Sequence, residues 1–181
     1  MNNRDNQKLP PGQQLVAPGK WPIVGERSPA AQAEPWTVAL GGCVHRPAKW
    51  TLEELRGMPS TSAVVDIHCV TRWSKFGVKL SGVRLSQLLE KVGISDDARF
   101  VSFTAASDRQ HSTSLPLSDA MKLDVLLALA TDEEPLPAEH GGPVRVIVPK
   151  RYFYKSLKWL THIELLKEDR LGYWESAAGY H

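Results

Sequence analysis

The sequence contains few of the features that mark a disulfide-rich, nucleic-acid-binding or membrane-binding protein. Only two cysteines, Cys43 and Cys69, occur in 181 residues, and one possible pair in a chain of this length is weak support for an oxidising compartment. The formal net charge is +2, with acidic and basic residues interspersed, so the clusters of Lys and Arg that bind nucleic acids are missing. We expect reduced cysteines, no nucleic-acid partner and a small-molecule ligand.

Signals for a membrane span, a nucleotide loop or a zinc site are missing as well. No apolar run approaches the ~18 residues of a membrane span, and residues 1–11 are polar, unlike a signal peptide. No GxGxxG or Walker pattern occurs, and no CxxC or HxxxH motif accompanies Cys69. We therefore expect a cytoplasmic protein with no membrane span, no nucleotide loop and no structural zinc.

The chain divides by composition into a leader, residues 1–35, and a domain, residues 36–181. The leader is rich in Pro, Gly, Gln and Ala without a sustained period, which predicts loose or extended chain. Its apolar residues 21–24 are expected to dock on the domain, and its first dozen residues are not. The domain is long enough to bury a core without disulfides.

Short strand and helix signals alternate through the domain. Strands are predicted at residues 36–40, 63–70, 99–105, 112–117, 144–148 and 159–166. One helix is predicted after Thr51, whose spacing to Glu54 forms a capping box, and another over about Ser86 to Val92. A third helical signal opens at Ser118, and residues 125–130 fit a buried strand or a helix. The predicted class is α+β, with a mostly β core and peripheral helices.

Cys69 ends an apolar run and is followed at once by polar residues. The period of two over Ala63 to Val70 places Cys69 in a core-facing row and His68 on the opposite face, where we expect a structural histidine. A lone cysteine is more often a small buried hydrophobe than a ligand. Thr71 and Arg72, however, offer a hydrogen-bond donor and a positive charge to a thiolate. Cys69 is therefore a candidate ligand for a soft metal or a candidate nucleophile.

Two further groups of polar residues are candidates for binding. The stretch from residue 140 to residue 158 concentrates donors that suit a phosphorylated ligand, and a solvated basic turn around aromatic core anchors explains it equally well. Its donors are His140, Arg145, Lys150, Arg151, Lys155, Ser156 and Lys158. Thr104, Asp108 and His111 lie in the connection between two predicted strands, where binding residues tend to sit. No GxSxG elbow is present, so a serine hydrolase is not favoured.

Three segments carry a family resemblance: DIHCVTRWS, FTAASDRQHSTSLPL and EHGGPVRVIVPKRYFYKSLKWLTHIELL. In order and spacing, over about residues 36–166, they resemble the molybdopterin-binding domain of the sulfite oxidase family. The GYW and GYH near the C-terminus are similar to the small stand-alone bacterial members. The resemblance implies the α+β sulfite oxidase molybdopterin-binding fold and a molybdenum-molybdopterin (Mo-MPT) cofactor.

The same resemblance assigns roles to individual residues. It makes Cys69 the catalytic sulfur ligand of the metal. It implies that Thr104 or Asp108 approaches the pterin and that His140 and Arg145 contact the phosphate end. The remaining candidate cofactor-binding residues are Thr71, Arg72, Lys155, Ser156, Leu157 and Lys158, the last three in part through backbone groups. The basic cluster then has a polyanionic partner.

The resulting hypothesis is a molybdopterin-dependent oxidoreductase that transfers an oxygen atom to or from a small oxide or oxyanion substrate. No haem-binding or immunoglobulin-like segment is recognised, so electrons are expected to pass to or from a separate electron-transfer partner. The sulfite-binding arginine of true sulfite oxidases has no match, because Arg27 stands in a different context, and the twin-arginine export signal is not matched. Two alternatives stay open: a molybdopterin-binding or carrier module without turnover, and a metal-free thiol protein with Cys69 as nucleophile.

Overall fold

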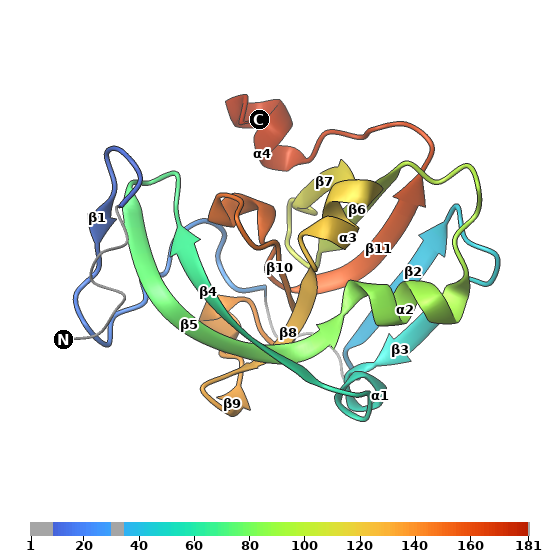
Figure 1. Cartoon of the computed structure of the whole chain (residues 1–181), viewed down its shortest axis with the longest axis horizontal. Helices are drawn as coiled ribbons and strands as arrows, with labels where there is room; N and C mark the ends of the chain where they lie inside the picture. The colour runs from blue at the N-terminus through green and yellow to red at the C-terminus, as the bar shows by residue number, and fades with distance from the viewer. Residues whose placement is uncertain (1–8, 30–34, 181) are drawn as a thin grey trace.

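The computed structural model describes residues 9–29 and 35–180, and within them the chain forms two β-sheets with short helices at their edges (Figure 1). The six-stranded sheet consists of β1 (Gln14–Leu15), β4 (Thr61–His68), β5 (Trp73–Arg84), β8 (Leu126–Thr131), β9 (Glu134–Pro135) and β10 (Arg145–Ile147). The five-stranded sheet has the order β3 (Ala48–Thr51), β2 (Thr37–Gly42), β11 (Leu160–Leu166), β6 (Phe100–Ala105) and β7 (Ser112–Pro116).

The helices are short. They are α1 (Leu52–Arg56), α2 (Leu85–Val92), α3 (Leu117–Lys122), α4 (Tyr173–Ala178) and the single 3-10 turns η1 (Ala138–His140) and η2 (Phe153–Lys155). The predicted capping box is present at the start of α1, because the Glu54 amide donates to Thr51 Oγ1 at 3.2 Å and the Thr51 amide donates to the Glu54 carboxylate at 2.7 Å. This mostly β architecture confirms the predicted fold class.

The structure settles one open choice and adds a long strand to the predicted elements. Residues 126–131 form a strand, β8, which settles the open choice between strand and helix because this segment pairs with both β5 and β10. The long strand β5 was not predicted. It contains Gly77 and Gly82, which weaken the local strand signal; Gly82 is required because a Cβ there would lie 1.9 Å from the Leu127 carbonyl oxygen.

The β4–β5 hairpin places Cys69 at its tip. The last pair of the ladder is His68 with Ser74. Beyond it, the Cys69 amide donates to the Trp73 carbonyl at 2.9 Å and the Arg72 amide donates to the Cys69 carbonyl at 3.0 Å. Arg72 has a left-handed backbone with φ 69°, which is typical of the last residue of a three-residue hairpin loop. This tight loop fixes the position from which the Cys69 side chain projects.

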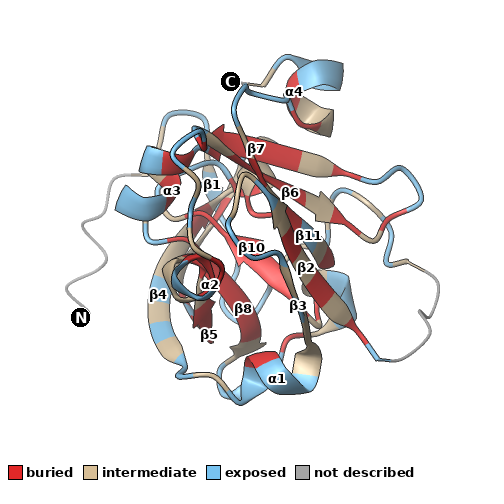
Figure 2. Cartoon of the chain, turned by 90° about the vertical axis from the view of Figure 1, so that its right-hand side faces the viewer, coloured by how far each residue is buried: buried red, intermediate tan, exposed pale blue. Residues whose placement is uncertain are grey.

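The larger of two hydrophobic clusters is built from both sheets and α2. It includes Val38, Leu88, Phe103 and Leu127, all fully buried. A smaller cluster around Ile67 lies against β5, β8 and β10. Figure 2 shows the buried segments gathered in the middle of the molecule, on β8, β10 and β11 among others. No helix of the described segments is long and apolar enough to cross a membrane.

Part of the leader packs on the domain. Gln14 and Leu15 pair in parallel with Trp73 and Ser74 of β5, and Trp21 packs against the smaller hydrophobic cluster. Of the residues 21–24 that were expected to dock, Trp21 thus packs on the domain, whereas Ile23 is 62% exposed. Residues 1–8 lie outside the described part of the chain, and the division at residue 36 stays a prediction.

Candidate active site

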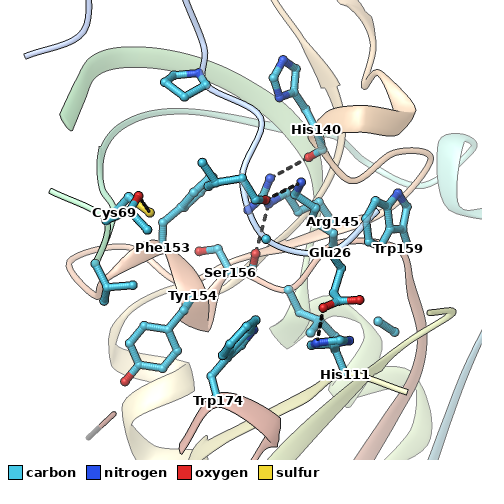
Figure 3. Close-up of a pocket in the computed structure, with 18 of the residues that line it drawn as sticks. Glu26, Cys69, His111, His140, Arg145, Phe153, Tyr154, Ser156, Trp159 and Trp174 are labelled. Carbon is cyan, nitrogen blue, oxygen red and sulfur yellow. Dashed lines mark hydrogen bonds and ion pairs between the residues drawn. The ribbon is translucent and has the colours of Figure 1, made fainter. Parts of the chain in front are cut away.

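A cavity of about 310 Å³ opens beside Cys69. Its walls come from the β4–β5 hairpin, the leader, the β6–β7 connection, the 140–159 segment and α4, which are far apart in the sequence (Figure 3). Because five separate segments meet here, the cavity exists only in the folded chain.

Cys69 takes part in hydrogen bonds through its amide, its carbonyl and its sulfur. Its side chain lines the cavity, and the residue is only 6% exposed. The Thr71 hydroxyl donates to Cys69 Sγ at 3.1 Å, and Gln13 Nε2 donates to the Cys69 carbonyl at 3.0 Å. A hydroxyl that donates to sulfur stabilises the thiolate, the form that binds metals.

Arg145 supplies a buried positive charge. Its residue is 3% exposed, Nε donates to the Ser156 carbonyl at 3.1 Å, and one terminal nitrogen donates to the His140 carbonyl at 2.7 Å. Its guanidinium carbon lies 3.8 Å from the centre of the Phe153 ring, a cation–π contact. Burial lowers the pKa of Arg145 to about 9, so the group stays protonated at neutral pH. Across the described residues, no acidic side chain forms a salt bridge with it.

Lys158 and His140 stand next to this charge. Lys158 Nζ donates to the Val24 carbonyl at 3.1 Å and to the Glu139 carbonyl at 2.9 Å. Burial and, next, the nearby Arg145 lower the pKa of Lys158 to about 8. The His140 ring stacks on Trp21 with centroids 4.1 Å apart, and burial lowers the pKa of His140. One wall of the cavity therefore carries cations whose hydrogen bonds go to neutral carbonyl groups.

The glycines of the HGG motif bring this wall together. Gly141 has φ +100°, and a Cβ on it would lie 2.8–2.9 Å from Lys158 atoms. A Cβ on Gly142 would lie 1.8 Å from the Leu136 carbonyl oxygen. The backbone at 141–142 thus approaches neighbouring chain more closely than any side chain allows.

Glu26 and His111 form an acid–base pair at the far side of the cavity. Glu26 Oε1 lies 3.0 Å from His111 Nε2, and Ser107 Oγ lies 2.9 Å from His111 Nδ1 (Figure 3). Burial lowers the pKa of His111, while the Glu26 carboxylate opposes that shift. Glu26 belongs to the leader, and nothing in its sequence context predicted that it would lie here.

The structure brings most of the candidate residues to one place. Of the candidate cofactor-binding residues, seven line the cavity: Cys69, Thr71, His140, Arg145, Ser156, Leu157 and Lys158. His111, the third member of the candidate group with Thr104 and Asp108, lines it as well. Thr104 and Asp108 line a second hollow instead, of about 590 Å³, which shares Ala105 with the first. Arg72 is exposed at the hairpin loop. The roles of all these candidate residues toward a cofactor stay predictions.

Lys155 and His68 have partners outside the cavity. Lys155 Nζ donates to the Ser114 carbonyl at 2.7 Å and forms an ion pair with Glu175. His68 Nδ1 lies 2.8 Å from Ser74 Oγ, as expected of a structural histidine. In the described part of the chain, no three His, Cys, Asp or Glu side chains are grouped as a metal site.

Sequence reasoning missed the aromatic part of the cavity. Its aromatic lining residues are Trp21, Trp73, Phe153, Tyr154, Trp159, Trp174 and Tyr180. The aromatic core anchors of the alternative basic-turn interpretation are Tyr152, Phe153 and Tyr154, and of these only Phe153 is buried. The GYW near the C-terminus was noted as a likeness, and it is the signal that could have found Trp174.

A protein-family model described as "Oxidoreductase molybdopterin binding domain" matches residues 25–174. The chain belongs to this family. The match begins within the leader and includes every cofactor-binding candidate named from the sequence, from Cys69 to Lys158, while Trp21 and Tyr180 of the cavity lie outside it. As a member of the oxidoreductase molybdopterin-binding family, the chain has molybdopterin-bound molybdenum as its cofactor, which confirms the cofactor predicted from the sequence.

Relatives of this family member include proteins of different length. The chain is 35% identical over 176 residues to an uncharacterized oxidoreductase, YuiH, of Bacillus subtilis, which covers 96% of this chain and 86% of that protein. It is 30% identical over 148 residues to the protein-methionine-sulfoxide reductase catalytic subunit MsrP of Xanthomonas axonopodis pv. citri, covering 74% of this chain and 46% of that protein. The chain thus spans about half the length of MsrP.

The fold of this family member is also that of a solved enzyme. The sulfane dehydrogenase SoxCD from Paracoccus pantotrophus matches it with a TM-score of 0.69 at 22% identity, over 77% of this chain and 39% of that chain. At this identity the likeness shows the fold, and it confirms the predicted sulfite oxidase architecture.

The donor set of the cavity fits the cofactor of the family. A thiolate-forming cysteine suits molybdenum, a metal that accepts soft ligands. Buried cations that have no salt bridge within the described part of the chain suit a phosphate group. The site therefore holds the two kinds of group that a pterin bearing both a metal and a phosphate requires.

Proposed function

We propose that this chain is a molybdenum-dependent oxidoreductase that uses Cys69 as the protein ligand of the metal and transfers an oxygen atom from a small oxide. One observation carries the proposal: Cys69 Sγ, which receives a hydrogen bond from Thr71, lines the same cavity as the buried Arg145. Among the described residues, no acidic side chain pairs with that arginine. A soft ligand and an anion site in one cavity are what the cofactor of this family needs.

Different residues of the cavity would bind the metal and the phosphate end of the cofactor. Cys69 would hold the metal, and Arg145, Lys158 and the His140 region would hold the phosphate end of the pterin. When bound, the cofactor would supply oxygen-atom exchange coupled to a two-electron change at molybdenum. Trp21 and Val24 of the leader would exclude water from the phosphate side, because Trp21 covers His140 and Val24 is tied to Lys158.

The substrate class that we propose is a sulfoxide. The naming of MsrP as a methionine-sulfoxide reductase supports this choice, as does the mixed aromatic and cationic lining of the cavity. Reduction of a sulfoxide takes up two electrons and two protons and releases a thioether and water. The electrons would come from a separate electron-transfer protein, and His111 paired with Glu26 could hold a proton at its Nε2. A cytoplasmic location remains a prediction.

Replacement of Cys69 tests the proposal. Protein from cells supplied with molybdate should contain molybdenum and pterin and should reduce N-acetylmethionine sulfoxide with a reduced dye. We expect Cys69→Ser to lower the turnover by at least about 100-fold, since the metal loses its thiolate. Cys43→Ser is the matched control, because Cys43 is partly exposed and does not line the cavity.

The outcome separates the alternatives. Full turnover by Cys69→Ser would contradict the ligand role. A wild-type protein that contains molybdenum and pterin but reduces no oxide would support the carrier module, and one that never contains molybdenum while Cys69 alkylates rapidly would support the thiol protein.

A further inference from the structure

We infer that the segment of residues 172–180 builds a substrate subsite, in which Tyr154, Trp174 and Tyr180 form an aromatic wall for the alkyl group beside the sulfur of a sulfoxide or thioether. The inference rests on the function proposed for the cavity and adds the part of the site that selects the substrate. The carrying observation is that this segment is anchored by specific buried contacts and sends two aromatic side chains into the cavity.

The segment is anchored at its start by a close backbone approach. Gly172 is buried, and a Cβ on it would lie 2.3 Å from the Ser112 carbonyl oxygen and 2.6 Å from Thr113 Cα. The next residue, Tyr173, packs its ring on His111 with centroids 4.2 Å apart and accepts a hydrogen bond from Arg109 at 2.9 Å. No other residue type fits at position 172 without moving β7, so the start of the segment has one defined position against that strand.

A buried ion pair between Glu175 and Lys155 holds the segment in that position. Glu175 is 4% exposed, and its Oε1 accepts a hydrogen bond from Thr113 Oγ1 at 2.8 Å and pairs with Lys155 Nζ. Lys155 belongs to η2 and precedes Ser156, which lines the cavity. The pair therefore connects α4 to the segment that carries the candidate cofactor-binding residues. The Lys155 ammonium is engaged in this ion pair, and Lys155 does not line the cavity.

The aromatic wall lies away from Arg145, Lys158 and His140, the basic residues that line the cavity. The one cation against it is Lys155, whose Nζ lies 5.7 Å from the centre of the Tyr154 ring and is paired with Glu175. Trp174 and Tyr180 line the cavity, and the Tyr180 ring packs on Tyr154 with centroids 5.1 Å apart. In Figure 3, Tyr154 and Trp174 lie on the side of the cavity opposite His140. Burial and, next, Glu175 raise the pKa of Tyr154, so its phenol stays neutral. The cavity thus has a charged side and an apolar, polarisable side.

This division matches the two things that the cavity would hold. The cofactor is an anion and requires the charged side. Thioether and sulfoxide groups next to aromatic rings gain both apolar burial and sulfur–aromatic contact. An inorganic oxyanion has no carbon group and gains neither. The wall therefore favours organic sulfoxides over inorganic oxyanions.

The first experiment measures binding without turnover. Calorimetry with N-acetylmethionine amide, the thioether product, is carried out on molybdenum-loaded wild type, Trp174→Ala, Trp174→Phe and Tyr180→Ala. We expect Trp174→Ala to raise the Kd about tenfold and Trp174→Phe, which keeps a ring, to raise it less. Tyr152→Ala is the control, because Tyr152 is exposed and does not line the cavity. Unchanged Kd values in both Trp174→Ala and Tyr180→Ala, or no binding by wild type, would overturn the inference.

The second experiment measures selectivity. With a reduced dye, the ratio of kcat/KM for N-acetylmethionine sulfoxide amide to kcat/KM for chlorate should fall about tenfold in Trp174→Ala. An unchanged ratio would overturn the inference. A wild type that reduces neither compound, yet binds the thioether and loses that binding in Trp174→Ala, would refute the proposed function while leaving the subsite intact.

The ion pair is tested as a positioning contact. Glu175→Gln should raise KM for the sulfoxide about fivefold with little change in kcat, because the wall moves while the metal site does not. Lys155→Arg keeps the ion pair with Glu175, so its KM for the sulfoxide should stay within about twofold of the wild-type value. A loss confined to kcat in Glu175→Gln would contradict the positioning role.

Discussion

Arg145 illustrates how a single residue sets the chemistry of the cavity. Its three contacts, to two carbonyl oxygens and one ring face, use the planar, forked shape of the guanidinium. The sequence predicted that Arg145 would bind an anion, because it lies in a donor-rich stretch with a family resemblance. It did not predict that the side chain would be buried with no acidic partner among the described residues, since that depends on which segments cover it.

Replacement of Arg145 by lysine keeps the positive charge and removes the planar, forked guanidinium group. We expect Arg145→Lys to lower cofactor content about tenfold and stability by about 1–3 kcal/mol, because at least one buried carbonyl loses its donor. Molybdenum analysis and urea unfolding measure the two effects. Arg56→Lys, at an exposed position of α1, is the control. Wild-type cofactor content in Arg145→Lys would contradict the account of this residue.

Lys158 makes cofactor binding depend on pH. Its pKa is about 8 in the cofactor-free protein, and a bound phosphate must raise it, because an anion favours the charged amine. Affinity is then fully present below pH 8 and is lost as pH rises through the higher pKa of the bound state.

We therefore expect the Kd for released molybdopterin to increase between pH 7 and pH 9, and the increase to be smaller in Lys158→Gln. Binding titrations across that range are the measurement, with Lys122→Gln, exposed on α3, as the control. Equal pH dependence in wild type and Lys158→Gln would show that Lys158 does not face the bound anion.

Among the elements, the HGG turn has the clearest consequence for the site. The HGG sequence at residues 140–142 is part of the family resemblance, and its physical reason in the structure is the close approach of Gly141 to Lys158. We expect Gly141→Ala to lower stability by about 1–3 kcal/mol, from strain at positive φ and from the crowding of Lys158, and to reduce cofactor content.

Gly19→Ala provides the matched control for this turn. Gly19 also has a positive φ of +76°, but nothing lies within 4 Å of a Cβ placed there. Comparison of thermal unfolding in the two variants separates crowding from backbone strain. If Gly19→Ala lost as much cofactor as Gly141→Ala, close packing at the HGG turn would not be the cause.

The elements were predictable to the extent that their signals are local. The strand before Cys69 and the capped helix α1 follow from periodicity and capping within a few residues, and both are present. The strand β5 was missed because Gly82 serves a contact with Leu127, more than forty positions along the chain. Glu26 and Trp174 were missed for the same reason, since each joins the site only through tertiary contacts.

For the whole molecule, the important fact is that the cavity joins both sheets, the leader and α4. A ligand bound there contacts all of these segments at once. Binding to the native state alone adds about 3–4 kcal/mol when free ligand is 100 to 1,000 times the Kd. We expect molybdenum-loaded protein to unfold on the order of 10 °C higher than cofactor-free protein.

Differential scanning calorimetry of protein from molybdate-supplied and molybdate-starved cells checks this shift. The Cys43→Ser variant should show the same shift as wild type, and Arg145→Lys a smaller one. Identical unfolding temperatures in loaded and empty wild-type protein would mean that the cofactor does not bind where the segments meet.

X-ray absorption at the molybdenum edge gives the decisive measurement. It counts the sulfur atoms bound to the metal in the loaded protein, independently of substrate or turnover. We predict one sulfur fewer in Cys69→Ser than in wild type, and no change in Cys43→Ser. An equal number of sulfur neighbours in wild type and Cys69→Ser would contradict the assignment of Cys69 as the ligand.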